Sequence, residues 1–269
     1  MLAWLMVPLA ASAAPPAELS FGIVPQQSAS KLARVWVPLL EAIGEQAGVR
    51  LRFQTATDIP TFERRLAQGE YDLAYMNPYH YTVFARDPGY RALVHADTRL
   101  RGVLVVRADS PLRDVHELQD ATLAFPAPAA FAASVLIRAE LAQLGIAFTP
   151  RYVASHDSVY RTVSVGLYPA GGGVVRTLEA LTPARRAELR VVMTTQGYTP
   201  HAFAAHPRVE QAMRERVTEA MLGLAADPGG RALIDVLGIP GFVRATDADW
   251  DDVRALGIDL LDDLQRETP

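Results

Sequence analysis

The chain has 269 residues, half of them apolar, with no cysteine and a formal net charge of −4. That length can bury a substantial core in one large or two medium-sized domains. Without disulfides, its stability must come from packing. The charge is weak and dispersed, and no Lys/Arg block stands out that would contact a phosphate backbone, so we expect no nucleic-acid partner.

The N-terminal segment has the pattern of a secretory signal peptide. Residues 2–11 form a short apolar region, and residues 11–14 (ASAA) offer small side chains for cleavage. The usual basic start is absent, because Lys31 is the first cation. The alternative is an apolar tail on a cytosolic protein. We predict that residues 1–17 are a signal peptide and that the mature protein is exported to the periplasm.

Strand-like and helix-like segments alternate along the first half of the chain. The apolar run 19–24 predicts a strand, and apolar residues at helical spacing predict a helix over 29–46 that Gly48 ends. The same patterns predict strands at 49–55, 71–76, 91–95 and 102–107, and a helix to Leu66 that Asp58 caps ahead of Pro60.

A second set of elements begins near Ser110. We predict strands at 121–125, 148–153 and 189–195, and helices at 129–144 and from about 157. After Pro200 the pattern is helical, at 208–225, 229–236 and 247–264. There is no internal repeat and no low-complexity linker.

Alternating strands and helices predict an α/β fold with mainly parallel sheets flanked by helices. Two such sets predict two lobes, and the runs near 103–109 and 191–198 are the expected hinge crossovers. Lobe 1 would comprise 18–105 plus 200–269, and lobe 2 would comprise 106–199. Ligands of such sheets bind beyond the carboxyl ends of the strands.

Two segments after predicted strands of the first lobe carry side chains that could bind a ligand. Gln26-Gln27-Ser28 follows the strand 19–24, although Ser28 would serve equally as a helix cap. Asn77–Tyr81 follows the strand 71–76 and gathers an amide, an imidazole and two phenols. Its alternative is a first helical turn in which the tyrosine rings pack and their hydroxyls reach water.

Two further segments belong to the second lobe. In Ala124–Ser134, two prolines precede a predicted helix start, whose free N–H groups and dipole suit an anion; the alternative is close packing through alanines. In Ser155–Thr177, the cluster Ser155-His156-Asp157 precedes the run Gly171–Gly173 and Arg176. The cluster would serve equally as a helix cap, and a glycine run alone is a weak signal.

Patterns of enzymes and metal sites are missing. The chain contains no G-x-S-x-G, H-E-x-x-H or GxxxxGK[ST] motif and no cysteine nucleophile. Its six histidines show no metal-ligand spacing. We therefore expect no catalytic residue, no metal and no cofactor.

Four stretches in order resemble one family. They are GIVP at 22–25, TATDIPTFERRLAQGEYDLAYMNPYHY at 55–81, DSPLRDVHELQDATLAF at 109–125 and SHDSVYRTV at 155–163. Together they resemble the phosphonate/phosphite-type substrate-binding proteins of bacterial ABC importers. The resemblance implies a periplasmic, two-lobed, hinged protein that closes on a phosphonate, phosphite or related oxyanion.

The resemblance also implies site residues. These are an aromatic residue in the turn matching Asn77–Tyr81, a histidine matching His156, and a Ser/Thr-rich helix start matching Ala130-Phe131-Ala132. The hydroxyls of that helix start are missing here. The acidic residue that the family often has near 166–170 is also missing. The resemblance thus implies the fold and leaves the ligand open, and thiol-dependent arsenite binding, known in relatives, is excluded without cysteine.

We predict a monomeric solute-binding protein that captures a small anionic or zwitterionic ligand by hinge closure for import through an ABC permease. One alternative is a sensory protein that presents its ligand-bound form to a membrane histidine kinase. Another is a hydrolase or transferase on the same fold.

The expected ligand contacts follow from these segments. They are Gln26, Gln27, Ser28, Asn77, Tyr79 and Tyr81 on lobe 1, Ala130, Phe131, Ala132, Ser134, His156, Tyr160 and Arg176 on lobe 2, and Tyr198 and His201 near the returning crossover. Because Ala130–Ala133 lacks hydroxyls, we expect a ligand that is less polar there than phosphate, or only singly charged. Alternatively, Phe131 points into the lobe core and backbone N–H groups alone bind a phosphonate.

Overall fold

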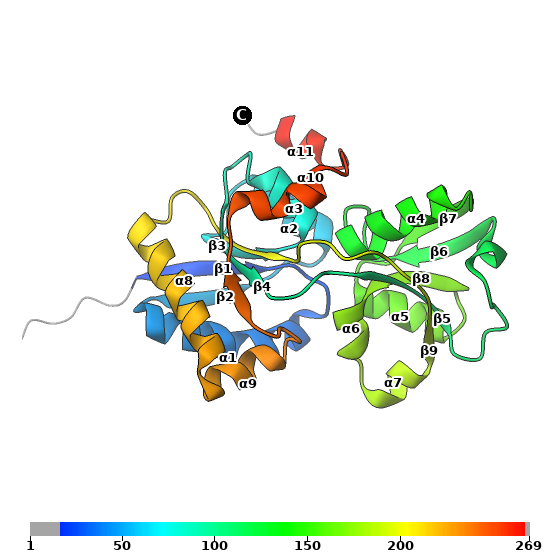
Figure 1. The fold of residues 1–269 in the computed structure, drawn as a ribbon, viewed down its shortest axis with the longest axis horizontal. Helices are drawn as coiled ribbons and strands as arrows, with labels where there is room; N and C mark the ends of the chain where they lie inside the picture. Colours follow the sequence, from blue (N-terminus) through cyan, green and yellow to red (C-terminus); the bar gives the residue numbers. More distant parts are fainter. Residues whose placement is uncertain (1–16, 267–269) are drawn as a thin grey trace, which may run out of the picture.

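Two open sheets organise the chain. The computed structural model describes residues 17–266, so the predicted signal peptide, residues 1–17, lies outside them except for Ala17. The first sheet has the order β11-β4-β10-β3-β1-β2 and the second β7-β6-β8-β5-β9. We call each sheet with its helices a lobe (Figure 1).

Four of the six strands in the first sheet run in the same direction. Its strands are β1 (Glu18–Ile23), β2 (Arg50–Gln54), β3 (Leu73–Met76), β4 (Arg91–Ala96), β10 (Ala202–Ala205) and β11 (Phe242–Arg244). β1 pairs in parallel with β2 and β3, whereas β10 is antiparallel to both β3 and β4. β4 therefore points the same way as β1, β2 and β3.

The second sheet repeats this plan. Its strands are β5 (Gly102–Arg107), β6 (Ala121–Phe125), β7 (Phe148–Tyr152), β8 (Ala170–Val174) and β9 (Leu189–Thr194). β6 pairs in parallel with β7 and β8, and β5 is antiparallel to β8 and β9. In both sheets the inserted antiparallel strand, β10 or β5, is the first one after the chain changes lobe. The predicted α/β fold with two mainly parallel sheets is confirmed.

Helices cover both faces of the first sheet. α1 (Ala29–Ala47), α8 (Gln211–Ala226) and α9 (Pro228–Asp235) lie on one face, and α2 (Ile59–Ala67), α3 (Pro78–Phe84) and α10 (Asp251–Arg254) lie on the other (Figure 1). As predicted, α1 ends at Gly48 in a left-handed conformation, and the Asp58 side chain caps α2 through the N–H of Thr61. The predicted helix 247–264 is instead three short ones: η3 (Asp247–Trp250), α10 and α11 (Asp262–Arg266).

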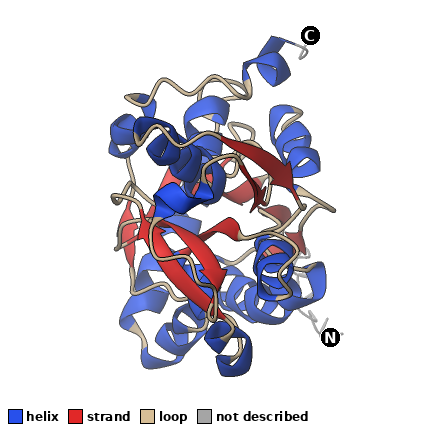
Figure 2. Ribbon diagram, turned by 90° about the vertical axis from the view of Figure 1, so that its right-hand side faces the viewer, coloured by secondary structure: helices blue, strands red, loops and turns tan. Residues whose placement is uncertain are grey.

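The second sheet separates two small cores. Leu104 and Val106 of β5 face the side of η1 (Val115–Leu118), η2 (Phe131–Leu136) and α4 (Ile137–Gln143). Val103 and Val105 face the side of α5 (His156–Ser164), α6 (Val175–Glu179) and α7 (Pro183–Ala187). This alternation is that of a strand covered on both faces, and Figure 2 shows the strands between layers of helices.

The glycine run 171–173 belongs to β8 and is not a loop. A Cβ on Gly172 would lie 1.9 Å from the carbonyl oxygen of Ala133, and one on Gly173 would lie 2.3 Å from the hydroxyl of Tyr160. The run therefore lets helices approach both faces of the strand closely.

The chain crosses between the lobes at 97–101 and 195–201. These segments are paired, because Leu100 and Tyr198 exchange backbone hydrogen bonds of 2.8 and 3.0 Å. Of the two runs in which we expected the crossovers, 103–109 coincides largely with β5. The run 191–198 covers the end of β9 and the first part of the second crossover. The proposed lobe boundary at 105/106 falls inside β5, and a division at 97–101 and 195–201 would keep every strand whole.

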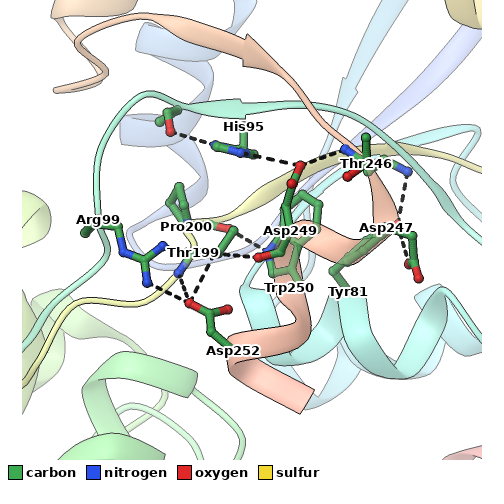
Figure 3. Close-up of polar contacts among 12 residues, drawn as sticks. Tyr81, His95, Arg99, Thr199, Pro200, Thr246, Asp247, Asp249, Trp250 and Asp252 are labelled. Carbon is green, nitrogen blue, oxygen red and sulfur yellow. Dashed lines mark hydrogen bonds and ion pairs between the residues drawn. The ribbon is translucent and has the colours of Figure 1, made fainter. Parts of the chain in front are cut away.

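The segment after β11 holds the two crossovers together (Figure 3). The carboxylate of Asp252 accepts hydrogen bonds from Arg99 Nη2 (2.7 Å) in one crossover and from the N–H of Thr199 (2.9 Å) in the other. Trp250 Nε1 donates to the carbonyl of Pro200 at 2.9 Å. One short C-terminal stretch therefore fixes where both connections leave the first lobe.

Candidate ligand-binding cleft

The carboxyl ends of the strands in both lobes face each other across a cleft. The first lobe contributes Gln26, which follows β1, and Asn77, which follows β3. The second lobe contributes His156 at the start of α5 and Arg176 at the start of α6. This is where open α/β sheets place their ligands.

Gln26 is the centre of contact between the lobes. Its side-chain oxygen accepts a 2.9 Å hydrogen bond from Arg176 Nη2, and its backbone carbonyl accepts one of 3.1 Å from the N–H of His156. Its side-chain nitrogen lies 3.1 Å from His201 Nε2. Because an amide nitrogen can only donate, this last bond requires His201 to be unprotonated at Nε2.

Arg176 reaches from the second lobe into the first. Besides Gln26, it donates to the carbonyl of Leu237 at 3.3 Å, and its guanidinium lies 5.5 Å from the ring centre of Tyr75. The Tyr75 ring in turn stacks on His201, with 4.9 Å between ring centres. Within residues 17–266, Arg176 forms no ion pair with a carboxylate. It is a half-buried cation that only neutral groups contact.

The two histidines of the cleft carry no compensating negative charge and are themselves neutral. Burial, with a contribution from the nearby Arg176, lowers the pKa of His156 to about 3. The same causes hold the pKa of His201 well below its ordinary value. Arg176 is therefore the charged group next to these neutral histidines. Arg99, Arg101 and Glu179 line a neighbouring cavity, and the Lys31–Asp157 pair (3.4 Å) lies at the rim.

Buried hydroxyls hold His156 in place. Its Nδ1 lies 3.1 Å from Thr177 Oγ1, which lies 2.8 Å from the hydroxyl of Tyr160. That phenol also accepts a hydrogen bond from the N–H of Val174, and burial raises its pKa to about 12. Tyr160 thus stays a neutral phenol that contacts Thr177 of α6 and the end of β8.

Asn77 makes a second contact between the lobes. Its side-chain oxygen caps α3 by accepting from the N–H of His80 (2.8 Å), and its nitrogen donates to the carbonyl of Ala129 in the second lobe (3.1 Å). Beside it, His80 Nε2 lies 2.9 Å from a carboxylate oxygen of Glu63, and both side chains are buried. Asn77 therefore caps α3 and also contacts the second lobe across the cleft.

The predicted helix start of the second lobe packs into the cleft. Ala130, Phe131 and Ala132 are buried in the same apolar cluster as first-lobe residues, and η2, which they begin, has no side-chain cap. The Phe131 ring meets that of Tyr198 edge to face, with 5.6 Å between centres. Phe131 therefore lies between the lobes, not inside the core of its own sheet.

Three predicted contacts lie elsewhere. The hydroxyl of Tyr79 accepts from the N–H of Leu261 (2.9 Å), and that of Tyr81 donates to Asp247 (2.9 Å). Both phenols thus point to the C-terminal segment, away from the cleft. Ser28 is exposed at the start of α1 and makes no cap hydrogen bond.

Two of the predicted residues, Ser134 and Gln27, make no side-chain hydrogen bond to the other cleft residues in the range 17–266. Ser134 is fully buried, and its hydroxyl has no hydrogen-bond partner within the described chain. Gln27 is half-buried at the start of α1. Tyr75 and Thr177 were missed from the sequence, although Tyr75 occupies the next-to-last position of a strand, where such residues face a ligand.

Two cavities flank Arg176. One of about 240 Å³ extends along α1, and one of about 140 Å³ is lined by Arg99, Arg101 and His201. Both include Tyr75 and Arg176 in their walls. Larger cavities of about 340 and 370 Å³ do not have Arg176 in their walls, although the first shares Lys31 and Ala180 with the cavity along α1.

Two α/β lobes, paired crossovers and a polar cleft between opposed strand ends define the class of two-lobed solute-binding proteins. The family model for periplasmic substrate-binding proteins of phosphonate ABC transporters matches residues 21–250. The chain belongs to this family. It is a family of binding proteins, not of enzymes.

Solved structures share the fold at low sequence identity. A binding-protein component of an ABC phosphonate transporter from Pseudomonas aeruginosa is 13% identical, with a TM-score of 0.82 over 90% of this chain and 86% of that one. PhnD1 from Prochlorococcus marinus, solved with methylphosphonate, is 16% identical, with a TM-score of 0.82 over 90% and 97%. A chloride-bound protein from Xanthomonas citri is 19% identical, with a TM-score of 0.69 over 89% and 99%. No helix in residues 17–266 is both long and apolar enough to cross a membrane.

Proposed function

We propose that this protein works in the periplasm and captures a small anion between its lobes by hinge closure, for delivery to an ABC permease. The family provides the transport role, and PhnD1, with the same fold, was solved with the anion methylphosphonate. The ligand and the motion are our inferences from the cleft.

The observation that carries the proposal is the unpaired charge of Arg176. A half-buried cation without an anionic partner is costly, since desolvation is offset only when opposite charge or strong hydrogen bonds replace water. Arg176 contacts neutral acceptors and lies between neutral histidines. An anion between the lobes would provide the missing charge and stabilise the closed arrangement.

The proposed contacts come from both lobes. They are Gln26, Tyr75, Asn77, Ala130, Phe131, Ala132, His156, Arg176 and His201, with Gln27, Ser134, Tyr160 and Tyr198 around them. Tyr79, Tyr81 and Ser28 are left out because of where their side chains lie. A ligand that touches both lobes stabilises closure by its greater affinity for the closed state.

Calorimetric titration tests whether the charge of Arg176 binds the anion. The ligands are alkylphosphonates, alkylsulfonates, phosphite, carboxylates and amino acids, ranked first by thermal shift. Arg176→Gln should weaken binding of the best anion at least tenfold, because charge-assisted hydrogen bonds are lost. The control is Arg161→Gln on α5. This substitution also removes one positive charge, but at an exposed arginine. Equal affinities of Arg176→Gln and the wild type would refute the proposal.

Small-angle scattering tests the motion. Saturation with the best anion should reduce the radius of gyration, since the lobes close around it. A radius that does not change at saturation would show that binding needs no hinge closure.

A further inference from the structure

We propose that the ligand is a singly charged organic anion whose hydrocarbon part lies in the cavity along α1. This inference rests on the proposed function, because it assigns the chemistry of the same cleft. It goes further by excluding zwitterions and by placing the carbon chain.

The cavity joins the charge of Arg176 to an apolar space. Its volume is about 240 Å³, and Gln26 and Arg176, which bond each other, are both in its wall. Much of the remaining lining is apolar: Leu32, Val35 and Trp36 of α1, with Val236 and Leu237 opposite. A group that replaces Gln26 on the guanidinium would therefore direct any attached carbon chain along this lining.

The outer part of the lining is also apolar. Val236 lines the cavity and is 65% exposed, although it follows α9, a helix that buries Ile234. Exposed aliphatic side chains are common singly, but here one borders an apolar cavity beside a charged anchor. This continuity favours a ligand chain of several carbons over a compact oxyanion.

The charges of the lining select against an ammonium group. No aspartate or glutamate lines this cavity in the described structure, and its two charged lining residues, Lys31 and Arg176, are both cations. Lys31 already pairs with Asp157. One unpaired cation therefore remains, which matches one negative charge and leaves a ligand's ammonium without a partner.

Alkylsulfonates isolate the role of the chain, because their head group carries one negative charge throughout. Calorimetric titration of the wild type with methane- to hexanesulfonate should show about fourfold tighter binding for each added methylene until the cavity is full. 2-Aminoethanesulfonate has the length of propanesulfonate and an ammonium in place of its methyl group. It should bind at least tenfold more weakly than propanesulfonate.

A variant that fills the cavity tests where the chain lies. Ala180 lines the cavity at the end of α6 and is exposed, so Ala180→Phe adds a ring there. It should bind methanesulfonate like the wild type and lose most of the gain for butane- to hexanesulfonate. Ala187→Phe is the control, because Ala187 is an exposed residue of α7 that does not line the cavity. It should leave the affinities for the whole sulfonate series unchanged.

The outcomes separate this inference from the proposed function. Affinity that is flat or falls with chain length, while short anions bind, would overturn the chain assignment and leave the anion-binding function standing. Equal losses for short and long sulfonates in Ala180→Phe would also overturn it. No binding of any anion by the wild type would overturn both proposals.

Discussion

The guanidinium of Arg176 in the second lobe donates a 2.9 Å hydrogen bond to the side-chain oxygen of Gln26 in the first. The same amide contacts His201, so a neutral side chain from one lobe lies between a cation and a neutral imidazole from elsewhere in the fold. Any anion that binds Arg176 must compete with this amide.

Gln26→Glu should therefore weaken anion binding at least tenfold. The carboxylate has the shape of the amide, but it would pair with Arg176 and provide internally the charge that the ligand brings. Ligand affinity is measured by calorimetry. Unfolding in urea shows whether the variant stays folded.

Gln27→Glu is the matched control, since it adds the same charge one residue away at a half-buried side chain with no hydrogen bond to Arg176. It should lose clearly less affinity. Equal losses in the two variants would mean that long-range charge acts on the ligand and that the contact with Arg176 does not matter.

Asn77→Asp should keep the cap of α3 and lose the contact between the lobes. A carboxylate oxygen can still accept from the N–H of His80, but it cannot donate to the carbonyl of Ala129 and would face it with negative charge. We expect ligand affinity to fall several-fold because the closed state loses a hydrogen bond.

Asn77→Ala separates the two roles, since it loses the cap as well and should cost about 1 kcal/mol of additional stability. Calorimetry and urea denaturation measure both effects. Wild-type affinity in Asn77→Asp would show that this bond contributes nothing to closure.

Tyr79→Phe and Tyr81→Phe should change stability and not binding. Each removes a hydroxyl that pairs with the C-terminal segment, at Leu261 or Asp247, so the free energy of unfolding should fall by about 1–2 kcal/mol. Ligand affinity should stay within twofold of the wild type. A tenfold loss of affinity in either variant would mean that its phenol contributes to ligand binding after all.

The direction of these phenols illustrates what local sequence leaves undetermined. The apolar run 71–76 correctly predicted a strand that ends at Met76, and the alternative interpretation of Asn77–Tyr81, a first helical turn, matches α3. All seven residues of α3 are buried, however, so no polar face shows which side chain points to the cleft. That choice depends on packing against residues 247–261, which are far away in the chain.

The missed strands have a similar cause. β8 (AGGGV) and β10 (AFAA) consist mostly of residues with low strand propensity, and neither was predicted as a strand. β8 needs glycine because Ala133 and Tyr160 approach its backbone closely. β10 lies between β3 and β4, whose pairing determines its conformation. In both strands tertiary contacts override local preference.

The contacts that Arg176 makes in the cleft could be predicted only in part from the sequence. Arg176 is among the ligand contacts expected from the sequence, and in the structure it lies at the start of α6 and lines both cavities of the cleft. Its contacts with Leu237 and Tyr75 depend on how the two lobes meet. No pattern within one lobe carries that information.

Asp252→Ala should destabilise the hinge. The carboxylate joins Arg99 and Thr199, one in each crossover, and its removal leaves the N–H of Thr199 without that acceptor (Figure 3). The free energy of unfolding should fall by about 1–3 kcal/mol. A double-mutant cycle with Arg99→Ala should give a coupling energy of at least about 0.5 kcal/mol.

The comparison variant is Asp235→Ala, which removes an exposed pair with Arg231 and should change stability by less than about 0.5 kcal/mol. A coupling energy near zero in the Asp252 cycle would mean that the two crossovers are held by other contacts, such as the bond between Trp250 and Pro200.

Neutral buried histidines should make the protein lose stability on mild acidification. His156 has an ordinary pKa of 6.5 and, in the folded cleft, one of about 3, chiefly because of burial. Between these values the unfolded chain binds the proton and the folded chain does not. The stability is therefore fully present above about pH 6.5 and falls as the pH drops, by up to about 1.4 kcal/mol per pH unit for each such histidine. His201 acts in the same direction.

Urea denaturation between pH 7.5 and 5, above the range in which carboxylates titrate, measures this slope. His156→Gln should flatten it, because the variant has one fewer group to protonate on unfolding. His116→Gln, at an exposed position in η1, should keep the wild-type slope. If His156→Gln and the wild type lost stability equally with falling pH, His156 would have to be protonated in the folded cleft, contrary to the lowering of its pKa by burial and by Arg176.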